Sequence, residues 1–329
     1  MRIGMVDILL ATYNGEKYLR KQIESILNQT YDMWHLLIRD DGSSDATKKI
    51  IKEYVCAYPS KIENIEDNRG NVGVVRNFKS LLQRSEHEYI MFCDQDDIWD
   101  HNKISREVKV MKEAEAQSNL KPILVFSDLR EIDSEENILV DSFNTKNEFS
   151  LDKIILSQIL FRNVVTGCTM LINKFLANEL LNMPDDIKMH DHWATLVCLV
   201  NNGCIRYINI PTVSYRQHSG NVIGDKSLSK RDIIKKIFGI ADYNEGKKKT
   251  VTYYKKVEYQ IHMLYKLYKE QISKKNKEML EDFDKIWIKP PGKRIYYLFK
   301  YRCFQKRMYD NLLLIMYFYK WGSNSNNLK

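Results

Sequence analysis

Three carboxylates within four residues are the strongest chemical signal in this sequence. Asp94, Asp96 and Asp97 directly follow residues 89–93, an apolar run of the kind that forms a buried strand. So much negative charge in one place is unfavourable unless a cation or solvent offsets it. Mg²⁺ and Mn²⁺ prefer hard oxygen ligands, and Mg²⁺ is typically held by one or two carboxylates together with substrate phosphates. The cluster therefore predicts a site for a divalent metal and a diphosphate. The alternative is a solvated acidic loop that caps the helix beginning near His101.

Two more polar clusters follow predicted strands closer to the N-terminus. Residues 12–14 come after the predicted strand 7–11, and residues 40–44 come after the predicted strand 34–38. Each cluster alone would be ordinary turn chemistry, because Asn-Gly and Asp-Gly are turn formers. In open α/β sheets, however, ligands bind beyond the carboxyl ends of the strands. Three polar clusters at one predicted edge therefore indicate a ligand site.

Common nucleotide-binding motifs are missing from this part of the chain. It has no G-x-x-x-x-G-K-[ST] phosphate loop, and residues 4–15 have no G-x-G-x-x-G dinucleotide signature. A nucleotide would therefore be held by acidic and polar side chains. Asp40 or Asp41 could accept the N3–H of a uracil or thymine ring, and Tyr13 could stack on that ring.

Strands and helices alternate along the first 130 residues, with apolar residues recurring at strand or helix spacing. The expected elements are a strand at 7–11, a helix over 18–27, a strand at 34–38, a helix containing 50–55, a helix through 81–82 and a strand at 89–93. Such alternation predicts an α/β fold with a mostly parallel sheet covered by helices on both faces.

The second half of the chain is more mixed. The expected elements are a strand at 124–127, a loop running into a strand over 164–172, a buried helix at 194–200 and short strands at 205–208 and 212–215. After residue 221 the sequence changes to a Lys-rich, aromatic helical pattern. We therefore place a boundary near residue 225, between an α/β domain (1–225) and a basic, helical C-terminal region (226–329).

Charge is divided unevenly between these regions. The chain of 329 residues carries a formal net charge of +8, but residues 226–329 hold 25 Lys and Arg against 10 Asp and Glu. Tyrosines lie among these lysines, and residues 311–321 mix aliphatic and aromatic side chains. Cations beside an aromatic face suit the surface of an anionic bilayer. The alternatives are a helical appendage that packs on the first domain, or one that pairs two subunits as a homodimer.

Other properties narrow the class of protein. The basic isoelectric point leaves a nucleic-acid-binding module as a rival, but the acidic first domain and the lack of a recognised motif weigh against a nucleic-acid partner. The six cysteines form no C-x-x-C pair, which predicts reduced thiols rather than a cysteine zinc site. The longest apolar run, 312–319, is far shorter than the roughly 20 residues of a membrane-spanning helix. No N-terminal signal sequence is apparent, so we expect a cytoplasmic protein, peripheral at the inner face of the cell membrane.

Four stretches together resemble the family 2 glycosyltransferases, which have the GT-A fold. They are LLATYNGEKYLRKQIESILNQTY, IRDDGSSDAT, NRGNVGVVRNF and CDQDDIW, and the resemblance covers roughly residues 5–220 in order. It implies an inverting hexosyltransferase that uses a nucleotide-diphosphate sugar and Mg²⁺ or Mn²⁺, with residues 1–225 as the catalytic domain. A metal-dependent nucleotidyltransferase is the rival enzyme, but it leaves the TYN and DDGS stretches unexplained.

The resemblance also assigns binding residues. Those expected to bind the nucleotide sugar are Thr12, Tyr13, Asn14, Glu16, Asp41, Asn71, Gly73, Arg76, Asn77, Asp94, Gln95, Asp97 and Arg216. Within this set, Asp41 would read the base and Arg76 would contact the base or a phosphate. Asp94 would face the ribose and hold the metal together with Asp96, and Asp97 would support the donor sugar.

Inversion needs a base that deprotonates the acceptor hydroxyl as it attacks the anomeric carbon opposite the diphosphate. The family usually places this Asp in a Glu-Asp pair at the start of a late helix, and Asp191 matches it. His190 stands where Glu is common, and His190, His192 and Trp193 are expected to contact the acceptor. The alternative is that Asp191 is simply a carboxylate favoured by the helix dipole.

The stretch YRQH at 215–218 resembles a segment of the rhamnosyltransferase-like members of the family. It implies that Arg216 contacts the diphosphate and that His218 is a further metal ligand. Together with CDQDDIW and HDHW, it favours dTDP-L-rhamnose as the donor, with a UDP-hexose or a UDP-N-acetylhexosamine as the alternative. The expected acceptor is a glycan or lipid-linked glycan in cell-surface polysaccharide synthesis.

Overall fold

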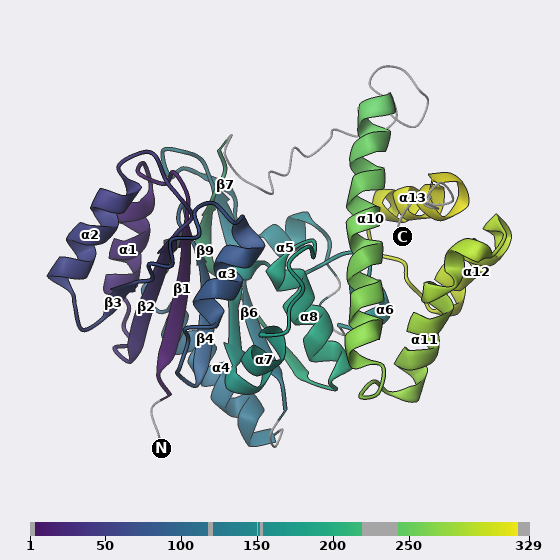
Figure 1. Cartoon of the computed structure of the whole chain (residues 1–329), viewed down its shortest axis with the longest axis horizontal. Coiled ribbons are helices and arrows are strands. Elements are labelled where there is room, and N and C mark those ends of the chain that lie inside the picture. Colours follow the sequence, from purple (N-terminus) through teal and green to yellow (C-terminus); the bar gives the residue numbers. More distant parts are fainter. Residues whose placement is uncertain (1–3, 118–120, 150, 152–153, 219–242, 322–329) are drawn as a thin grey trace. The chain divides into compact units, whose positions relative to one another are not determined.

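The computed structural model describes residues 4–117, 121–149, 151, 154–218 and 243–321. The chain divides into two compact units, and Figure 1 labels most of their helices and strands. Unit 1 comprises residues 1–147 and 163–216, and unit 2 comprises residues 148–162 and 217–329. The boundary expected near residue 225 lies outside the described residues.

Unit 1 is built on one mixed, mostly parallel sheet, as the sequence predicted. β1 (Val6–Thr12), β2 (Trp34–Asp40), β3 (Ile62–Asn64) and β4 (Tyr89–Asp94) are parallel. β8 (Met170–Asn173) is antiparallel to both β4 and β6 (Ile123–Ile132), and β6 is parallel to β9 (Cys204–Arg216). The strand order is β3-β2-β1-β4-β8-β6-β9-β5, in which β5 is Ile98–Trp99, and β7 (Ile138–Val140) pairs with β6.

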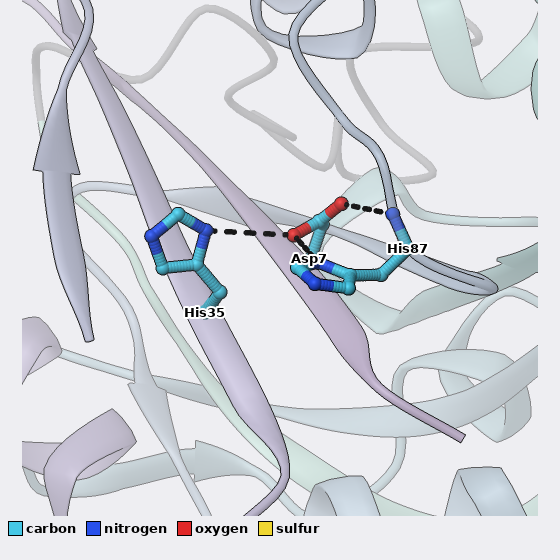
Figure 2. Close-up of side chains that lie close together, drawn as sticks. All are labelled: Asp7, His35 and His87. Carbon is cyan, nitrogen blue, oxygen red and sulfur yellow. Dashed lines mark hydrogen bonds and ion pairs between the residues drawn. The ribbon is translucent and has the colours of Figure 1, made fainter. Parts of the chain in front are cut away.

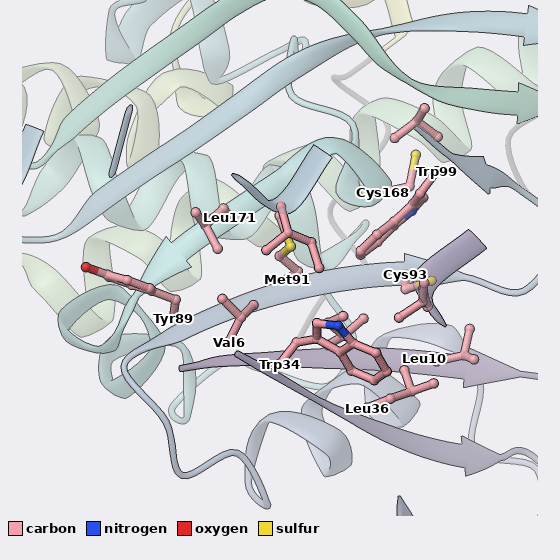
Figure 3. Packing of buried hydrophobic residues seen from close by; sticks show 14 of the residues in the cluster. Val6, Leu10, Trp34, Leu36, Tyr89, Met91, Cys93, Trp99, Cys168 and Leu171 are labelled. Atoms are coloured by element: carbon pink, nitrogen blue, oxygen red, sulfur yellow. The ribbon is translucent and has the colours of Figure 1, made fainter. Parts of the chain in front are cut away.

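Apolar residues on both faces of the strands explain why helices cover the sheet on both sides. Val6, Ile8 and Leu10 belong to a core cluster with α1 (Leu19–Leu27), α2 (Thr47–Ala57) and α4 (Lys103–Gln117). Figure 3 shows part of this cluster. Leu9 is equally buried, and because side chains alternate along a strand it points to the other face. The helices α3 (Val74–Leu82), α7 (Lys174–Leu180) and α8 (His190–Val200) pack on the sheet besides these.

One strand prediction was wrong. The two short strands expected at 205–208 and 212–215 form a single strand, β9 (Cys204–Arg216). The prediction assigned residues 209–211 to neither strand. In the structure, β9 stays paired with β6 through this stretch by shifting register next to Asp128. A local bulge of this kind keeps a strand continuous across an irregular sequence.

Three short helical turns connect elements of the chain: α5 (Phe143–Lys146) and η1 (Gly167–Thr169) in unit 1, and α6 (Leu156–Ile159) in unit 2. All six cysteines are free, and four of them are buried, whereas Cys56 is exposed and Cys204 is partly buried.

Unit 2 is helical. Its remaining elements are α10 (Tyr243–Tyr268), α11 (Lys274–Asp284), η2 (Ile286–Ile288), α12 (Pro291–Lys300), α13 (Met308–Met316) and η3 (Tyr317–Trp321). Aromatic rings form much of its core: Tyr317 stacks on Tyr254 at 4.7 Å, and Phe318 contacts Phe283 and Tyr297. No helix in the described part of the chain has the length and apolar character needed to cross a membrane.

Residues 148–162 pack with these helices, although they lie within the region that the sequence analysis placed in the first domain. The Phe161 ring contacts Phe283 at 5.9 Å and Phe318 at 5.5 Å. The Tyr253 hydroxyl donates to the Phe161 carbonyl at 2.9 Å, and Arg162 forms an ion pair with Asp310. Unit 2 is therefore completed by a segment from the middle of the chain.

Candidate active site

The three polar clusters meet at one edge of the sheet, as the sequence predicted. β1, β2 and β4 are parallel, with Thr12 paired to Asp40 and Ala11 paired to Asp94. β6 and β9 run in the same direction as β1, β2 and β4, because β8 lies between β4 and β6 and is antiparallel to both. The end of β9 at Arg216 therefore reaches the same edge.

The loop after β1 is fixed to the loop after β2 by two of the predicted ligand residues. Asn14 has a φ of 48°, and its side-chain oxygen accepts from the Ser44 N–H at 2.9 Å. The Glu16 carboxylate accepts from the Ala46 N–H at 2.8 Å. Both side chains therefore hold the shape of this edge.

Gln95 joins the loop after β4 to the loop after β1. Its side-chain oxygen accepts from the Tyr13 N–H at 2.8 Å, and its side-chain nitrogen donates to the Tyr13 carbonyl at 2.9 Å. A Cβ at Gly15 would lie 2.3 Å from that oxygen, so this close approach requires glycine. Thr12 is buried, and its hydroxyl donates to Asp40 Oδ1 at 3.1 Å. The Tyr13 ring is 49% exposed, which leaves it accessible for stacking on a base.

Asp41 organises the loop that leads into α3. The buried Arg39 donates to Asp41 at 2.8 Å and to Asp67 at 2.9 Å, and its hydrogen bonds lower the pKa of Asp67. The Asp41 carboxylate also accepts from the N–H groups of Val72 and Gly73, each at 2.8 Å. Gly73 has a φ of 83°, which favours glycine. A carboxylate offers about four acceptor positions, so the predicted base-reading role of Asp41 is compatible with these three donors.

Asn71, Arg76 and Asn77 lie around the same loop. Asn71 is exposed. The Arg76 side chain is 49% exposed, with Nε 3.5 Å from Asp185. Asn77 is buried, and its amide donates to the Arg39 carbonyl at 3.3 Å. Within the part of the chain that the structure describes, its side-chain oxygen has no hydrogen-bond partner. Arg76 and Asn71 therefore reach solvent, whereas Asn77 supports β2 from within.

Asp191 and Asp94 are far apart in the sequence, but both lie against the turn at Gly167 and Cys168: a Cβ at Gly167 would be 3.7 Å from the Asp191 Cβ, and the Cys168 Sγ lies within 4.8 Å of an Asp94 carboxylate oxygen. Burial raises the pKa of Asp94 to about 7, and the charges of Asp96 and Asp191 add to the effect. Burial likewise raises the pKa of Asp191 to about 6. The structure thus brings the predicted base together with the predicted metal-binding loop.

The start of α8 holds the Asp191 carboxylate in place. The carboxylate accepts from the His192 N–H at 2.5 Å. Hydrogen bonds from the Gly167 backbone and the Asn163 side chain, together with the charge of Lys188, favour its ionised form and partly offset burial. At neutral pH this leaves an ionised carboxylate that can accept a proton.

Carboxylates also form a potential metal-binding group. One ligand atom from each of Asp94, Asp97 and Cys168 lies within 4.8 Å of the others. Burial and the neighbouring carboxylates raise the pKa of Cys168 well above its usual value, so the thiol stays neutral and is not a ligand for a hard cation. The buried Asp97 has an Oδ2 without a hydrogen-bond partner in the described part of the chain. Carboxylate oxygens of this kind fit Mg²⁺ or Mn²⁺. Asp96 and His218, the other predicted ligands, lie outside this group.

The Arg216 side chain holds the acidic loop after β4 (residues 94–97) in place from the interior of unit 1. Its side chain is 1% exposed. Its Nε donates to the Asp96 carbonyl at 3.0 Å and one terminal nitrogen donates to the Asp133 carbonyl at 3.2 Å. Its backbone N–H donates to Asp97 Oδ1 at 3.2 Å, and its guanidinium lies 4.6 Å from the Tyr18 ring centre. The sequence placed Arg216 on the diphosphate, whereas the structure gives it a buried, bracing environment.

The residues predicted to contact the acceptor are also buried. His190 stacks on Phe92 at 5.0 Å and lies 4.2 Å from Phe78. Burial lowers its pKa to about 3, so the ring is neutral. His192 and Trp193 are fully buried in α8. These three side chains therefore pack behind Asp191 in the structure, and an acceptor would not reach them in this arrangement.

Sequence reasoning missed four residues of this site: Arg39, Asn163, Gly167 and Cys168. Arg39 carries a signal, because a charged residue at the end of an apolar strand beside two aspartates needs a buried partner. Gly167 and Cys168 belong to the stretch 164–172, which the sequence predicts as a loop running into a strand, and Asn163 directly precedes it. Gly167 lies so close to His190 that a Cβ there would be 2.7 Å from the ring. Only the fold brings this segment against α8.

Comparisons with known proteins agree with this geometry. The model of the Glycosyl transferase family 2 matches residues 7–180. Among curated relatives, the dTDP-rhamnosyl transferase RfbG of Shigella flexneri is 29% identical over 226 residues, which cover 65% of this chain and 73% of RfbG. Among solved structures, S. aureus TarS in complex with UDP has a TM-score of 0.53 at 14% identity, covering 85% of this chain and 87% of that one. TarS in complex with UDP-GlcNAc gives the same values.

The low identity to TarS establishes the fold alone. The family match, in contrast, spans more than half of the chain and includes all three polar strand ends. This chain therefore belongs to glycosyltransferase family 2 and has the GT-A fold.

Proposed function

We propose that this chain is an inverting, metal-dependent glycosyltransferase that moves a sugar from a nucleotide diphosphate to a glycan or lipid-linked glycan acceptor in cell-surface polysaccharide synthesis. The observation that carries the proposal is the proximity of a buried carboxylate, Asp191, to the acidic loop that begins at Asp94. Such a transfer needs a group that accepts the proton of the acceptor hydroxyl and a site that neutralises the charge of the diphosphate.

Asp191 is the proposed base. Its hydrogen bonds to backbone N–H groups and to Asn163 fix its orientation, and its pKa of about 6 keeps it ionised at neutral pH yet basic enough to take a proton. The acceptor hydroxyl would lose its proton to Asp191 while its oxygen forms a bond to the anomeric carbon and the bond to the diphosphate breaks. Much of the rate gain would come from holding the two substrates in line.

Asp94 and Asp96 are the proposed metal ligands from the sequence, and Asp97 is a third candidate because its Oδ2 has no hydrogen-bond partner in the described residues and one of its carboxylate oxygens lies within 4.8 Å of an Asp94 carboxylate oxygen. A bound divalent cation supplies positive charge that neutralises the leaving diphosphate. The raised pKa of Asp94 supports this assignment, because clustered carboxylates that repel one another gain most from a cation. Arg216 fixes the backbone of this loop through the carbonyl of Asp96.

For the donor we propose dTDP-L-rhamnose. The similarity to RfbG and the YRQH stretch support it. The alternative is a UDP sugar, such as a UDP-hexose or a UDP-N-acetylhexosamine.

The donor assignment is tested by thermal shift with dTDP-rhamnose, dTDP-glucose, UDP-glucose and UDP-GlcNAc in the presence of Mg²⁺ or Mn²⁺. The true donor should stabilise the folded chain most, because binding to the native state adds to its stability. Measuring how fast the chain hydrolyses each of the same four nucleotide sugars checks the result. Turnover of UDP sugars without turnover of dTDP-rhamnose would refute the rhamnosyl donor.

We further propose that unit 1 is the catalytic domain and that unit 2 contacts the anionic inner face of the cell membrane. In unit 2, Ile288, Tyr296 and Phe299 are exposed, and the neighbouring Lys289 and Lys293 are exposed as well. Aromatic and aliphatic side chains next to lysines suit an anionic bilayer surface. A second copy of the chain, forming a homodimer, is the alternative partner for this face.

A further inference from the structure

A second group of potential ligands lies at the opposite edge of the sheet from Asp94. Asp7 lies near the start of β1 and pairs with His35 near the start of β2. His87 lies just before β4. Figure 2 shows these three side chains gathered around the Asp7 carboxylate. Asp7 lies five positions before Thr12 in β1, about 16 Å at the usual rise per residue, so this group is distinct from the proposed catalytic centre.

The three side chains are nearly arranged for metal binding. His87 Nδ1 lies 2.6 Å and His35 Nδ1 lies 3.7 Å from the same oxygen, Asp7 Oδ1. All three ligand atoms lie within 4.8 Å of one another. Zinc bonds of about 2.0–2.1 Å in a tetrahedral site place ligand atoms roughly 3.3 Å apart. Side-chain shifts of less than about 1 Å would therefore admit an ion.

The Asp7 carboxylate is already oriented for this task. Its Oδ2 accepts from the N–H groups of Glu86 and His87 at 2.8 and 2.9 Å. These bonds leave Oδ1 directed at the two imidazoles, and outer hydrogen bonds of this type hold metal ligands in place. Asp7 is buried, yet the histidine side chains are 22% and 36% exposed, which gives an ion a path from solvent.

The local charge also favours a cation. The negative charges of Asp7, Glu63 and Glu86 all act on His35, and no lysine or arginine is among the groups whose charges act most strongly on it. Two imidazoles and one carboxylate are ligands typical of Zn²⁺ and its first-row neighbours rather than of Mg²⁺.

We propose that Asp7, His35 and His87 form a binding site for a Zn²⁺-type transition-metal ion, separate from the glycosyltransferase centre. The ion would join β1, β2 and the turn before β4, three segments distant in sequence. It would therefore stabilise unit 1 and would take no part in sugar transfer. The proposal does not depend on the identity of the donor or of the catalytic base.

The test uses Co²⁺, whose visible absorption reports coordination by protein ligands. With excess Mg²⁺ present to occupy the acidic loop, we expect the full-length chain to bind one Co²⁺ with a histidine-type spectrum, Zn²⁺ to displace it, and Zn²⁺ to raise the melting temperature. His35→Gln and His87→Gln should each weaken Co²⁺ binding by at least about tenfold. His101→Gln, which changes an exposed histidine of the same unit, should have no effect.

Two further measurements keep the proposal open to refutation if a histidine variant folds poorly. Asp94→Asn should leave the Co²⁺ spectrum unchanged, because the acidic loop is at the other edge of the sheet. X-ray absorption of the zinc-loaded wild-type chain should show imidazole ligands at about 2.0–2.1 Å. A wild-type chain without a Co²⁺ spectrum, a spectrum that survives in both histidine variants, or one that disappears in Asp94→Asn would overturn the assignment.

Discussion

Asp191 is buried at the start of α8, and its carboxylate is held by backbone N–H groups and by Asn163. Replacing it with asparagine keeps the size and most of the acceptor capacity but removes the ability to take a proton. We expect Asp191→Asn to lower the rate of sugar transfer by about 10²–10⁴-fold, the usual contribution of a general base, with donor affinity unchanged. Initial rates and calorimetric titration of the donor measure the two effects. Loss of donor binding would indicate a structural role instead.

The protonation of Asp191 predicts how activity depends on pH. Because burial raises its pKa to about 6, the carboxylate is protonated below that value and cannot act as a base. The transfer rate at saturating donor and Mg²⁺ should therefore rise as the pH passes through about 6 and then level off. Rates measured between roughly pH 5 and pH 8 test this. A profile that is flat across that range would exclude Asp191 as the titrating base.

The raised pKa of Asp94 predicts that the stability of the folded chain depends on both pH and bound metal. Its pKa is raised to about 7, so without a metal the native state holds a proton that the unfolded state releases near the ordinary value of 3.8. The stability from this group is present below that ordinary value and is lost as the pH rises through about 7. Mg²⁺ with a nucleoside diphosphate should thus raise the melting temperature more at about pH 7.5 than at about pH 5.

Asp94→Asn is the matched variant for this link. It removes the repelling charge, so the metal-free variant should have a higher melting temperature than the metal-free wild type at about pH 7.5. Mg²⁺ should raise the melting temperature of the variant only slightly. Differential scanning fluorimetry with and without EDTA measures both effects. An equal Mg²⁺ response in the two proteins would place the ion elsewhere.

At the scale of the elements, the contact between Gln95 and Gly15 predicts that substitutions at these two positions have coupled effects on stability. Gln95→Ala removes two hydrogen bonds between the loops after β4 and β1, which should cost about 1 kcal/mol and weaken donor binding. Gly15→Ala should have a similar effect, because its Cβ would displace the Gln95 side chain. In the double variant the losses should not add, since both act on one contact. Urea unfolding gives the three free energies, and simple additivity would show that the two positions are independent.

The hydrogen bonds of Arg216, at the end of β9, predict a second effect on stability. Arg216→Met leaves the part-buried carbonyls of Asp96 and Asp133 without their donors and removes a buried cation from its contacts, so we expect a loss of about 1–3 kcal/mol and much weaker donor binding. Arg206 lies on the same strand with one hydrogen bond, to Gln117. Arg206→Met should change stability by less than about 0.5 kcal/mol. Similar losses in the two variants would argue against a specific role for Arg216.

Sequence patterns predicted the elements of unit 1 well where apolar periodicity is strong. β1, β2 and β4 each contain at least three consecutive apolar residues, and α1 repeats apolar residues at helical spacing. β9 was divided in the prediction, and the pairing with β6 that keeps it whole is a non-local interaction. Residues 148–162 were assigned to the wrong neighbours for the same reason, since their partners lie about a hundred residues further along.

The site was predicted in its residue types but less well in the direction of its side chains. The strand ends at Thr12, Asp40 and Asp94 could be placed at one edge because parallel strands share their orientation. Whether a polar side chain faces a ligand or fixes a neighbouring loop depends on contacts across the fold. Gln95 and Arg216 thus read as ligands in the sequence but hold loops together in the structure.

At the scale of the whole molecule, the exposed side chains of unit 2 predict membrane binding. The double variant Tyr296→Ser and Phe299→Ser should reduce flotation with anionic vesicles by at least about tenfold, because it removes the apolar part of the contact. Ile138→Ser with Leu139→Ser removes two exposed aliphatic residues from unit 1 and serves as the control. Equal flotation of both variants, or binding to neutral vesicles as strong as to anionic ones, would contradict this prediction. A variant that instead becomes monomeric would identify a homodimer face.

Residues 148–162 have a consequence for how such enzymes diversify. Phe161 and Arg162 are made on the ribosome long before Phe283, Phe318 and Asp310, the residues that they contact, so unit 2 cannot finish folding until nearly the whole chain has emerged. A recombination event that exchanged only the C-terminal third between two relatives would leave this segment against foreign helices. Successful chimeras should therefore carry both pieces from the same parent.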